Sequence, residues 1–180
     1  MSPMKPESQE RFVEAWGAMG ALWGVNRSVA RVHALLMASE TPISLDEISD
    51  RLQISKGNAS MSLRELRAWG VVRTAPLAAD RRDYYVTEPD VWTMFFRILL
   101  ERKRREFDPA LQAVRGLLDE PGATGDVRAR LEQMADLLGT LEGLASRLLK
   151  DPASSRAALS FLSGMALPGL GRAARKRRPA

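Results

Sequence analysis

The sequence predicts a mainly helical fold in which two short helices, joined by a tight turn, are followed by a two-stranded hairpin and flanked by longer helices. Between residues 44 and 70, two amphipathic stretches each begin at a serine that can cap a helix. Directly after them, residues 71–74 and 83–87 are rich in branched and aromatic side chains and enclose a turn region. This order of elements is that of a winged helix-turn-helix.

The N-terminal part is expected to supply an arm and two helices. In residues 1–24, apolar side chains between positions 7 and 23 recur four, three and four residues apart, which predicts a helix for packing or dimerisation. A second helix is expected from Asn26, which can cap it, to about Ser39. Thr41-Pro42-Ile43 predicts an extended connector, because proline disfavours helix in the residue before it.

The two central helices have recognisable ends, inside a winged-helix domain expected to span residues 25–90. Ser44-Leu45-Asp46-Glu47 fits a capping box, in which the hydroxyl and the Glu47 carboxylate satisfy the first free amides. Ser55 should cap the next helix, which should end at Gly70. Its inward face is predicted to comprise Ala59, Leu63 and Leu66.

Helices are also expected over residues 91–166, as a dimerisation region, followed by a basic disordered tail at 167–180. Glu88-Pro89 is expected to start a long helix, with proline near its first turn. Asp108-Pro109 is expected to kink or restart that helix. Asp151-Pro152 is expected to open a last helix that reaches about Met165.

A helix expected from Asp126 to about Lys150 carries an apolar seam whose spacing alternates between four and three residues. This spacing is a heptad pattern and needs a partner surface. We expect the seam to be shared between the two subunits of a homodimer, and packing within one subunit is the alternative. The seam comprises Val127, Leu131, Met134, Leu138, Leu141, Ala145 and Leu148.

Composition narrows the classes of function. The chain has no cysteine and one histidine, His33, so we expect neither a metal site nor a cofactor. The net charge is +5, but the last ten residues hold five basic and no acidic residues, which leaves 22 basic against 22 acidic residues elsewhere. A surface that binds a polyanion must therefore come from the placement of charge.

Enzymatic activity and membrane contact are not expected. Asp46 and Glu47 are adjacent on a helix and point about 100° apart, so the two carboxylates cannot converge on a substrate. No glycine-rich phosphate loop or nucleophile motif is present. The apolar runs are short and the N-terminus is polar, which favours a cytoplasmic protein that is nucleoid-associated when bound to DNA.

The second central helix has an outward face suited to double-stranded DNA. Such a helix enters the major groove, where short polar and cationic groups contact base edges and phosphates. Asn58 is suited to an adenine edge, and Lys56 or Arg64 to a guanine edge or a phosphate. A merely solvated face is the alternative. The predicted contacts are Ser55, Lys56, Gly57, Asn58, Ser60, Met61 and Arg64, with Arg81 and Arg82 at the hairpin tip for the minor groove.

These residues resemble the winged-helix domain of the GbsR/MarR family of bacterial regulators over Arg31 to Trp92. The motifs that carry the resemblance are Ala30 to Leu36, Ser55 to Leu66, Trp69 to Arg73 and Asp80 to Tyr85. The resemblance implies a transcription regulator, which we expect to be a repressor, that binds a pseudo-palindromic operator as a homodimer. It also implies that Ser55 to Ser60 read DNA while Arg81 or Arg82 follows the minor groove. The alternative is a protein–protein adaptor that keeps a winged helix without binding DNA.

A small-molecule effector is a further candidate partner, because regulators of this architecture often bind one beside the dimer helices. An aromatic cage would suit a quaternary ammonium ligand, and plain core or dimer packing is the alternative. His33 is expected to be a structural residue, with a pH or ligand switch as its alternative. The run Arg102-Lys103-Arg104-Arg105 is expected to be solvated, or else to meet phosphates beside the operator. The candidate effector residues are Trp16, Trp23, Trp92, Phe95 and Phe96.

Overall fold

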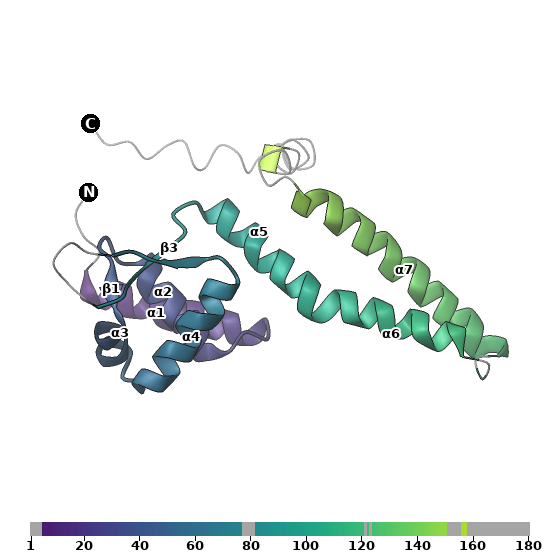
Figure 1. The fold of residues 1–180 in the computed structure, drawn as a ribbon, viewed down its shortest axis with the longest axis horizontal. Helices are drawn as coiled ribbons and strands as arrows, with labels where there is room; N and C mark the ends of the chain where they lie inside the picture. The colour runs from purple at the N-terminus through teal and green to yellow at the C-terminus, as the bar shows by residue number, and fades with distance from the viewer. Residues whose placement is uncertain (1–4, 77–81, 121, 123, 151–155, 158–180) are drawn as a thin grey trace. The chain divides into compact units, whose positions relative to one another are not determined.

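A computed structural model shows the described part of the chain as helices and one small sheet (Figure 1). By contact, the chain divides into two compact units, residues 1–98 and 99–180. None of the described helices combines the length and the apolar character that crossing a bilayer requires. The structure describes residues 5–76, 82–120, 122, 124–150 and 156–157.

The helices of the first unit begin where the sequence predicts caps. Asn26 Oδ1 accepts a hydrogen bond from the Ser28 amide at 2.8 Å. The predicted capping box of Ser44 and Glu47 is confirmed, with both of its reciprocal hydrogen bonds present. The caps can be predicted from the sequence because each capping side chain forms its hydrogen bond within the first turn of its own helix. The helices are α1 (Pro6–Leu22), α2 (Arg27–Met37), α3 (Leu45–Leu52) and α4 (Lys56–Ala68).

The sheet has three antiparallel strands in the order β1-β3-β2, one more than the sequence predicts. The expected hairpin forms from β2 (Val72–Thr74) and β3 (Tyr84–Thr87). Residues Ile43–Ser44, expected to be part of a connector, form strand β1 on the other edge of β3, with Ile43 opposite Tyr85. The extra strand anchors the start of α3 to the hairpin of β2 and β3, which is called the wing below.

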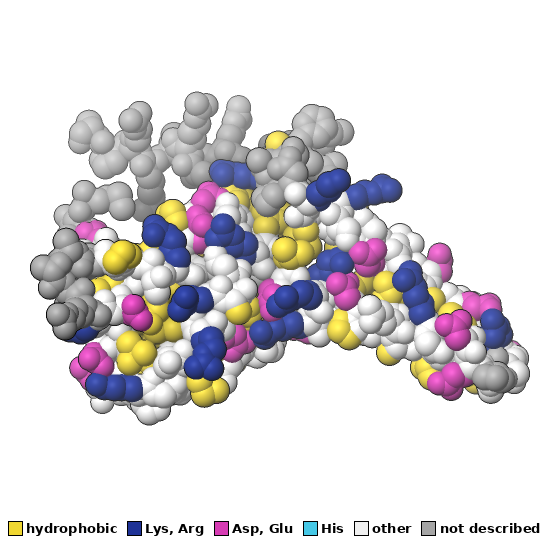
Figure 2. Space-filling model, viewed as in Figure 1, with side chains coloured by type: hydrophobic (Ala, Val, Ile, Leu, Met, Phe, Trp, Pro, Cys, Tyr) yellow, Lys and Arg dark blue, Asp and Glu magenta, His cyan; other side chains and the backbone are white. Residues whose placement is uncertain are grey.

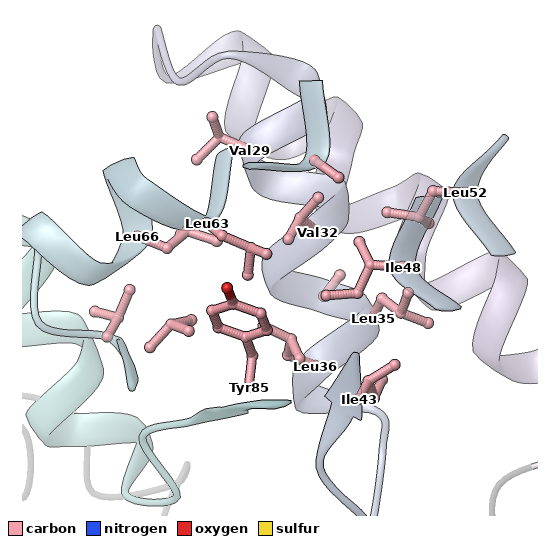
Figure 3. Packing of buried hydrophobic residues seen from close by; sticks show 14 of the residues in the cluster. Val29, Val32, Leu35, Leu36, Ile43, Ile48, Leu52, Leu63, Leu66 and Tyr85 are labelled. Carbon is pink, nitrogen blue, oxygen red and sulfur yellow. The ribbon is translucent and has the colours of Figure 1, made fainter. Parts of the chain in front are cut away.

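The core of the first unit lies between the helices and the sheet (Figure 3). Leu63 and Leu66 of α4 and Tyr85 of β3 lie against the side chains of α2 in this view. The predicted inward face of α4 is confirmed, because Ala59, Leu63 and Leu66 are at most 2% exposed. Ser62, also 2% exposed, joins that face. One side of α4 is therefore fixed in the core and cannot contact a ligand.

Helix α5 (Val91–Arg102) begins later than predicted. The Asp90 side chain accepts a hydrogen bond from the Thr93 amide at 2.8 Å, so Asp90 caps the helix. The prediction that Glu88-Pro89 starts the helix is wrong, because the aspartate after the proline offers a better acceptor for the first amides.

The predicted restart at Asp108-Pro109 takes the form of a π-helical turn. Residues Lys103–Phe107 form this turn, η1, and α6 (Asp108–Asp119) follows with its proline in the first turn. Proline has no amide hydrogen to donate to the preceding turn, and a change of hydrogen-bond pattern accommodates that loss.

Helix α7 (Gly125–Lys150) lies beside α6, as Figure 1 shows. It confirms the helix predicted from Asp126. On α6, Leu111 and Val114 are buried, whereas α7 has no fully buried residue. The last helix predicted to reach Met165 falls mostly outside the described residues, and the predicted tail at 167–180 falls wholly outside them.

Candidate nucleic-acid interface

The outward face of α4 carries the residues that the sequence predicts to contact DNA. Ser55, the N-cap, accepts a hydrogen bond from the Asn58 amide at 3.2 Å, which fixes the first turn. Ser60 is half-buried, and the other predicted side chains are exposed. The structure thus places the residues of the first turn and two residues of the following turns on one exposed surface. They are Ser55, Lys56, Gly57, Asn58, Met61 and Arg64.

Lys56 forms an ion pair that the sequence did not predict. Its Nζ lies 2.7 Å from Asp46 Oδ1 of α3, and both side chains are well exposed. The hydrogen bond and the charge of Asp46 raise the pKa of Lys56, so the ammonium stays protonated. The pair spans the turn between two helices, and no sequence spacing identifies such a contact. Asp46 therefore holds a cation at the start of α4, where a phosphate would be attracted.

Asn58 is anchored to neighbouring side chains. Its Nδ2 donates to Ser28 Oγ of α2 at 3.1 Å, and its Oδ1 accepts from Ser62 Oγ at 3.4 Å. Reading an adenine edge uses both the amide oxygen and the amide nitrogen. These contacts fix α4 against the start of α2. The amide oxygen and the amide nitrogen each have capacity for a second hydrogen bond, so the base contact predicted for Asn58 stays a prediction.

Of the two wing arginines predicted to contact the minor groove, the structure describes Arg82. Arg82 donates to Tyr84 Oη at 2.7 Å, and its guanidinium lies 5.5 Å from the centre of the same ring. Tyr84 itself is only 7% exposed. The wing thus holds Arg82 at its base. Arg81, the other predicted minor-groove residue, lies outside the described residues.

Two further exposed cations were missed by the sequence analysis. Arg67 lies three residues after Arg64 on α4, and Arg73 points outward from β2 between neighbours that are less exposed. Helical spacing and strand alternation could have identified both. Figure 2 shows basic and acidic side chains interspersed on the drawn face, in keeping with a body of balanced charge.

The basic run at residues 102–105 does not form a free cationic surface. Lys103 is not solvated as expected, because its side chain is only 14% exposed. Arg104 and Arg105 are solvated as expected, with 68% and 48% of their side chains exposed. Every cation of the run has an ion-pair partner within the second unit, and contact with phosphates beside the operator stays a prediction. The ion pairs join Arg102 to Glu106, Lys103 to Asp108 and Glu142, and Arg104 and Arg105 to Glu101.

The predicted effector aromatics occur in separate places along the first unit. Phe96 lies 6.3 Å from Trp92 and 5.9 Å from Phe95, as measured between ring centres on α5. Trp16 of α1 has a different set of ring contacts, with Phe12 at 5.9 Å and His33 at 6.2 Å. Trp23, at the end of α1, is 53% exposed.

His33 is built into the core. It is 2% exposed, and its Nε2 lies 3.1 Å from Thr87 Oγ1 of β3. Burial lowers the pKa of His33 to about 4, so the ring is neutral near pH 7. This environment supports the structural role expected for it.

The seam on α7 divides into two edges. Leu131, Leu138, Ala145 and Leu148 are half-buried, while Val127, Met134 and Leu141 are 61%, 49% and 43% exposed. Leu137 and Leu144, outside the predicted seam, are 59% and 55% exposed. The apolar face is therefore broader than the predicted seam. Its open residues recur three and four positions apart: Met134, Leu137, Leu141 and Leu144.

Comparison with known proteins finds a likeness in the first unit, where residues 23–83 match the model of the MarR family. Over this segment the chain is similar to the helix-turn-helix domain of the MarR family. The match contains α2, α3, α4 and β2, and it confirms the MarR part of the predicted resemblance together with the winged helical fold. The GbsR part stays a prediction.

The likeness extends beyond the MarR-family domain. The chain is 28% identical over 146 residues to the HTH-type transcriptional regulator MmpR5 of Mycobacterium tuberculosis (strain ATCC 25618 / H37Rv), covering 81% of this chain and 86% of that protein. A crystal structure described as that of a transcriptional regulator is similar with a TM-score of 0.61 and 26% identity, over 79% of this chain and 96% of the other. These likenesses support a DNA-binding regulator.

Proposed function

We propose that this chain is a transcription repressor that binds a pseudo-palindromic operator in double-stranded DNA as a homodimer. The observation that carries the proposal is that α4 has one buried face and one exposed face. Ala59, Leu63 and Leu66 fix one side in the core, and the opposite side is exposed from Lys56 to Arg64. A helix anchored in this way can enter a major groove without losing its own packing.

The N-terminus of α4 suits a phosphate. Its first amides carry partial positive charge, Gly57 adds no side chain there, and the Lys56 ammonium lies beside them. Arg64 and Arg67 lie further along the helix and suit guanine edges or the opposite strand. The wing arginines, Arg81 and Arg82, suit the adjacent minor groove.

Pairing of two chains is supported by the open edge of α7. Met134, Leu137, Leu141 and Leu144 expose between 43% and 59% of their surface within one chain. A second copy that covers this edge would bury it and present two α4 helices to two half-sites, each of which contributes to the affinity.

An effector that releases the DNA is supported by the aromatic group on α5. Phe95, in contact with Phe96, is 37% exposed, and α5 is bonded to the end of the DNA-reading helix. Arg97 of α5 donates both to the Gly70 carbonyl oxygen, just after α4, and to Glu88. A ligand that moves α5 would therefore act on the C-terminal end of α4.

The test is selection of bound fragments from genomic DNA, followed by a binding assay on the enriched sequence. We expect a two-fold symmetric site, two subunits per site, and repression of a promoter that contains it. Arg64→Ala should weaken binding to this site, whereas Arg130→Ala, a change of the same type on α7, should not. Enrichment no better than for random DNA, or equal affinity of the Arg64 variant and the wild type, would overturn the proposal.

A further inference from the structure

Met61 is a large apolar side chain in the middle of a polar surface. It is 69% exposed on the outward face of α4, four residues after Gly57 and three before Arg64. These spacings place all three residues on one stripe of the helix. A single exposed apolar residue is ordinary on a protein surface. Evidence that Met61 contacts a ligand must therefore come from the residues around it.

Gly57 is a glycine that the fold does not require. A Cβ built on it would have one neighbour within 4 Å, Ser55 Oγ at 3.9 Å, and its backbone φ is not positive. Glycine inside a helix lowers its stability relative to alanine. Neither packing nor backbone conformation explains it, and the remaining use of a glycine is to let another molecule come close.

Gly57 and Met61 shape the same patch of the α4 surface. Side chains in a helix lean toward its N-terminus, so the Met61 side chain extends over the turn that contains Gly57. Because Gly57 has no side chain, the thioether of Met61 is left uncovered on that side. An approaching surface can therefore reach both the Met61 side chain and the backbone at Gly57.

The chemistry of this patch fits one feature of the major groove. A thioether has no hydrogen to donate and is a weak acceptor, so it selects an apolar contact. In the major groove, that contact is the C5-methyl group of thymine. Lys56 and Arg64 flank the patch with positive charge, which suits DNA and disfavours a purely apolar protein partner.

We propose that Met61 reads a thymine methyl group in each half-site, and that Gly57 lets the helix come close enough for this contact. The inference rests on the proposed function and makes it more specific. It assigns a sequence preference to one side chain of α4.

The experiment replaces each thymine of the selected operator in turn by deoxyuridine, which lacks only the methyl group. For the wild-type protein, one thymine per half-site should show a loss of affinity of about fourfold, the value expected for one methyl-sized group removed from water. Met61→Gln, similar in length but polar, should bind the thymine and deoxyuridine operators equally. Met61→Leu should keep the discrimination.

A second variant tests the close approach. Gly57→Ala favours the helix, so its thermal unfolding midpoint should stay the same or rise while operator affinity falls. Loss of affinity would then not be a loss of folding.

The outcomes separate the two proposals. If no thymine is sensitive in the wild type, or if Met61→Gln keeps the same sensitivity, the reading by Met61 is overturned while the operator-binding function stands. Gly57→Ala with undiminished affinity would overturn the close approach. If selection yields no operator at all, the proposed function fails and this inference fails with it.

Discussion

Removing the Lys56 ammonium should weaken operator binding without unfolding the protein. The ion pair between Lys56 and Asp46 is 68% and 47% exposed on its two sides, and exposed ion pairs contribute little to stability. The thermal unfolding midpoint of Lys56→Ala should therefore match that of the wild type. A loss of DNA affinity in this variant would then report a lost contact.

The size of the effect follows from counterion release. Each phosphate neutralised by a cation adds about 0.9 to the slope of log affinity against log salt concentration. Two subunits each lose one such contact, so the slope should become shallower by about 1.8. Between 50 and 200 mM salt, the affinity of the wild type should therefore fall roughly twelvefold more than that of the variant.

The assay is a salt titration of operator binding by fluorescence anisotropy, with Asp46→Asn as the matched control. This control keeps a hydrogen-bond acceptor for Lys56 but removes the carboxylate that competes with phosphate. It should bind at least as tightly as the wild type, with an undiminished salt slope. An unchanged slope in Lys56→Ala would refute the reasoning, because Lys56 would then neutralise no phosphate.

Three further predictions concern the core, the first cap and the assembly. Burial lowers the pKa of His33 to about 4, below its usual 6.5, so the stability it contributes is complete above pH 6.5 and is lost as the pH falls toward 4. In urea unfolding, the wild type should lose about 2 kcal/mol more than His33→Gln between pH 7 and pH 5; equal losses would contradict a buried neutral ring. Ser44→Ala removes both hydroxyl contacts of the capping box and should cost about 1 kcal/mol in the same assay, whereas unchanged stability would leave the cap without energetic weight. Leu141→Asp changes a side chain that is 43% exposed, so the subunit should fold but sediment as a monomer; a persisting dimer would place the interface elsewhere.

Much of the first unit could be predicted because its signals are local. The caps at Asn26, Ser44 and Ser55 each bond within their own first turn, so residue type and spacing are enough to find them. The same holds for the end of α4, where Gly70 adopts a φ of 72°. The inward face of α4 followed from helical spacing alone.

The contacts that shape the candidate interface are not local. Strand β1 pairs with a segment about 40 residues later, and only the folded chain shows that the outer edge of β3 is available to it. Asp46 meets Lys56 across a turn, and Ser28 holds Asn58 between two helices. The sequence therefore indicated which residues lie on the surface of α4, but not which of them are engaged by neighbours.

The seam on α7 was predicted too narrowly for a related reason. A two-position heptad describes the contact with one neighbour, whereas α7 lies beside α6 and still leaves an apolar edge open. Periodicity identifies apolar positions, but their division between two neighbours depends on how the first neighbour packs. Leu137 and Leu144 could be assigned to the open edge only from the structure.

The entry of α4 into a major groove is tested most directly by a DNA-cleaving reagent attached to that helix. The chain contains no cysteine, so Ala68→Cys, at an exposed position in the last turn of α4, creates a unique site for a tethered iron chelate. On the selected operator, cleavage should fall into two clusters about one helical turn apart, one for each subunit. Cleavage spread evenly along the duplex, or identical on operator and random DNA, would contradict the placement of α4.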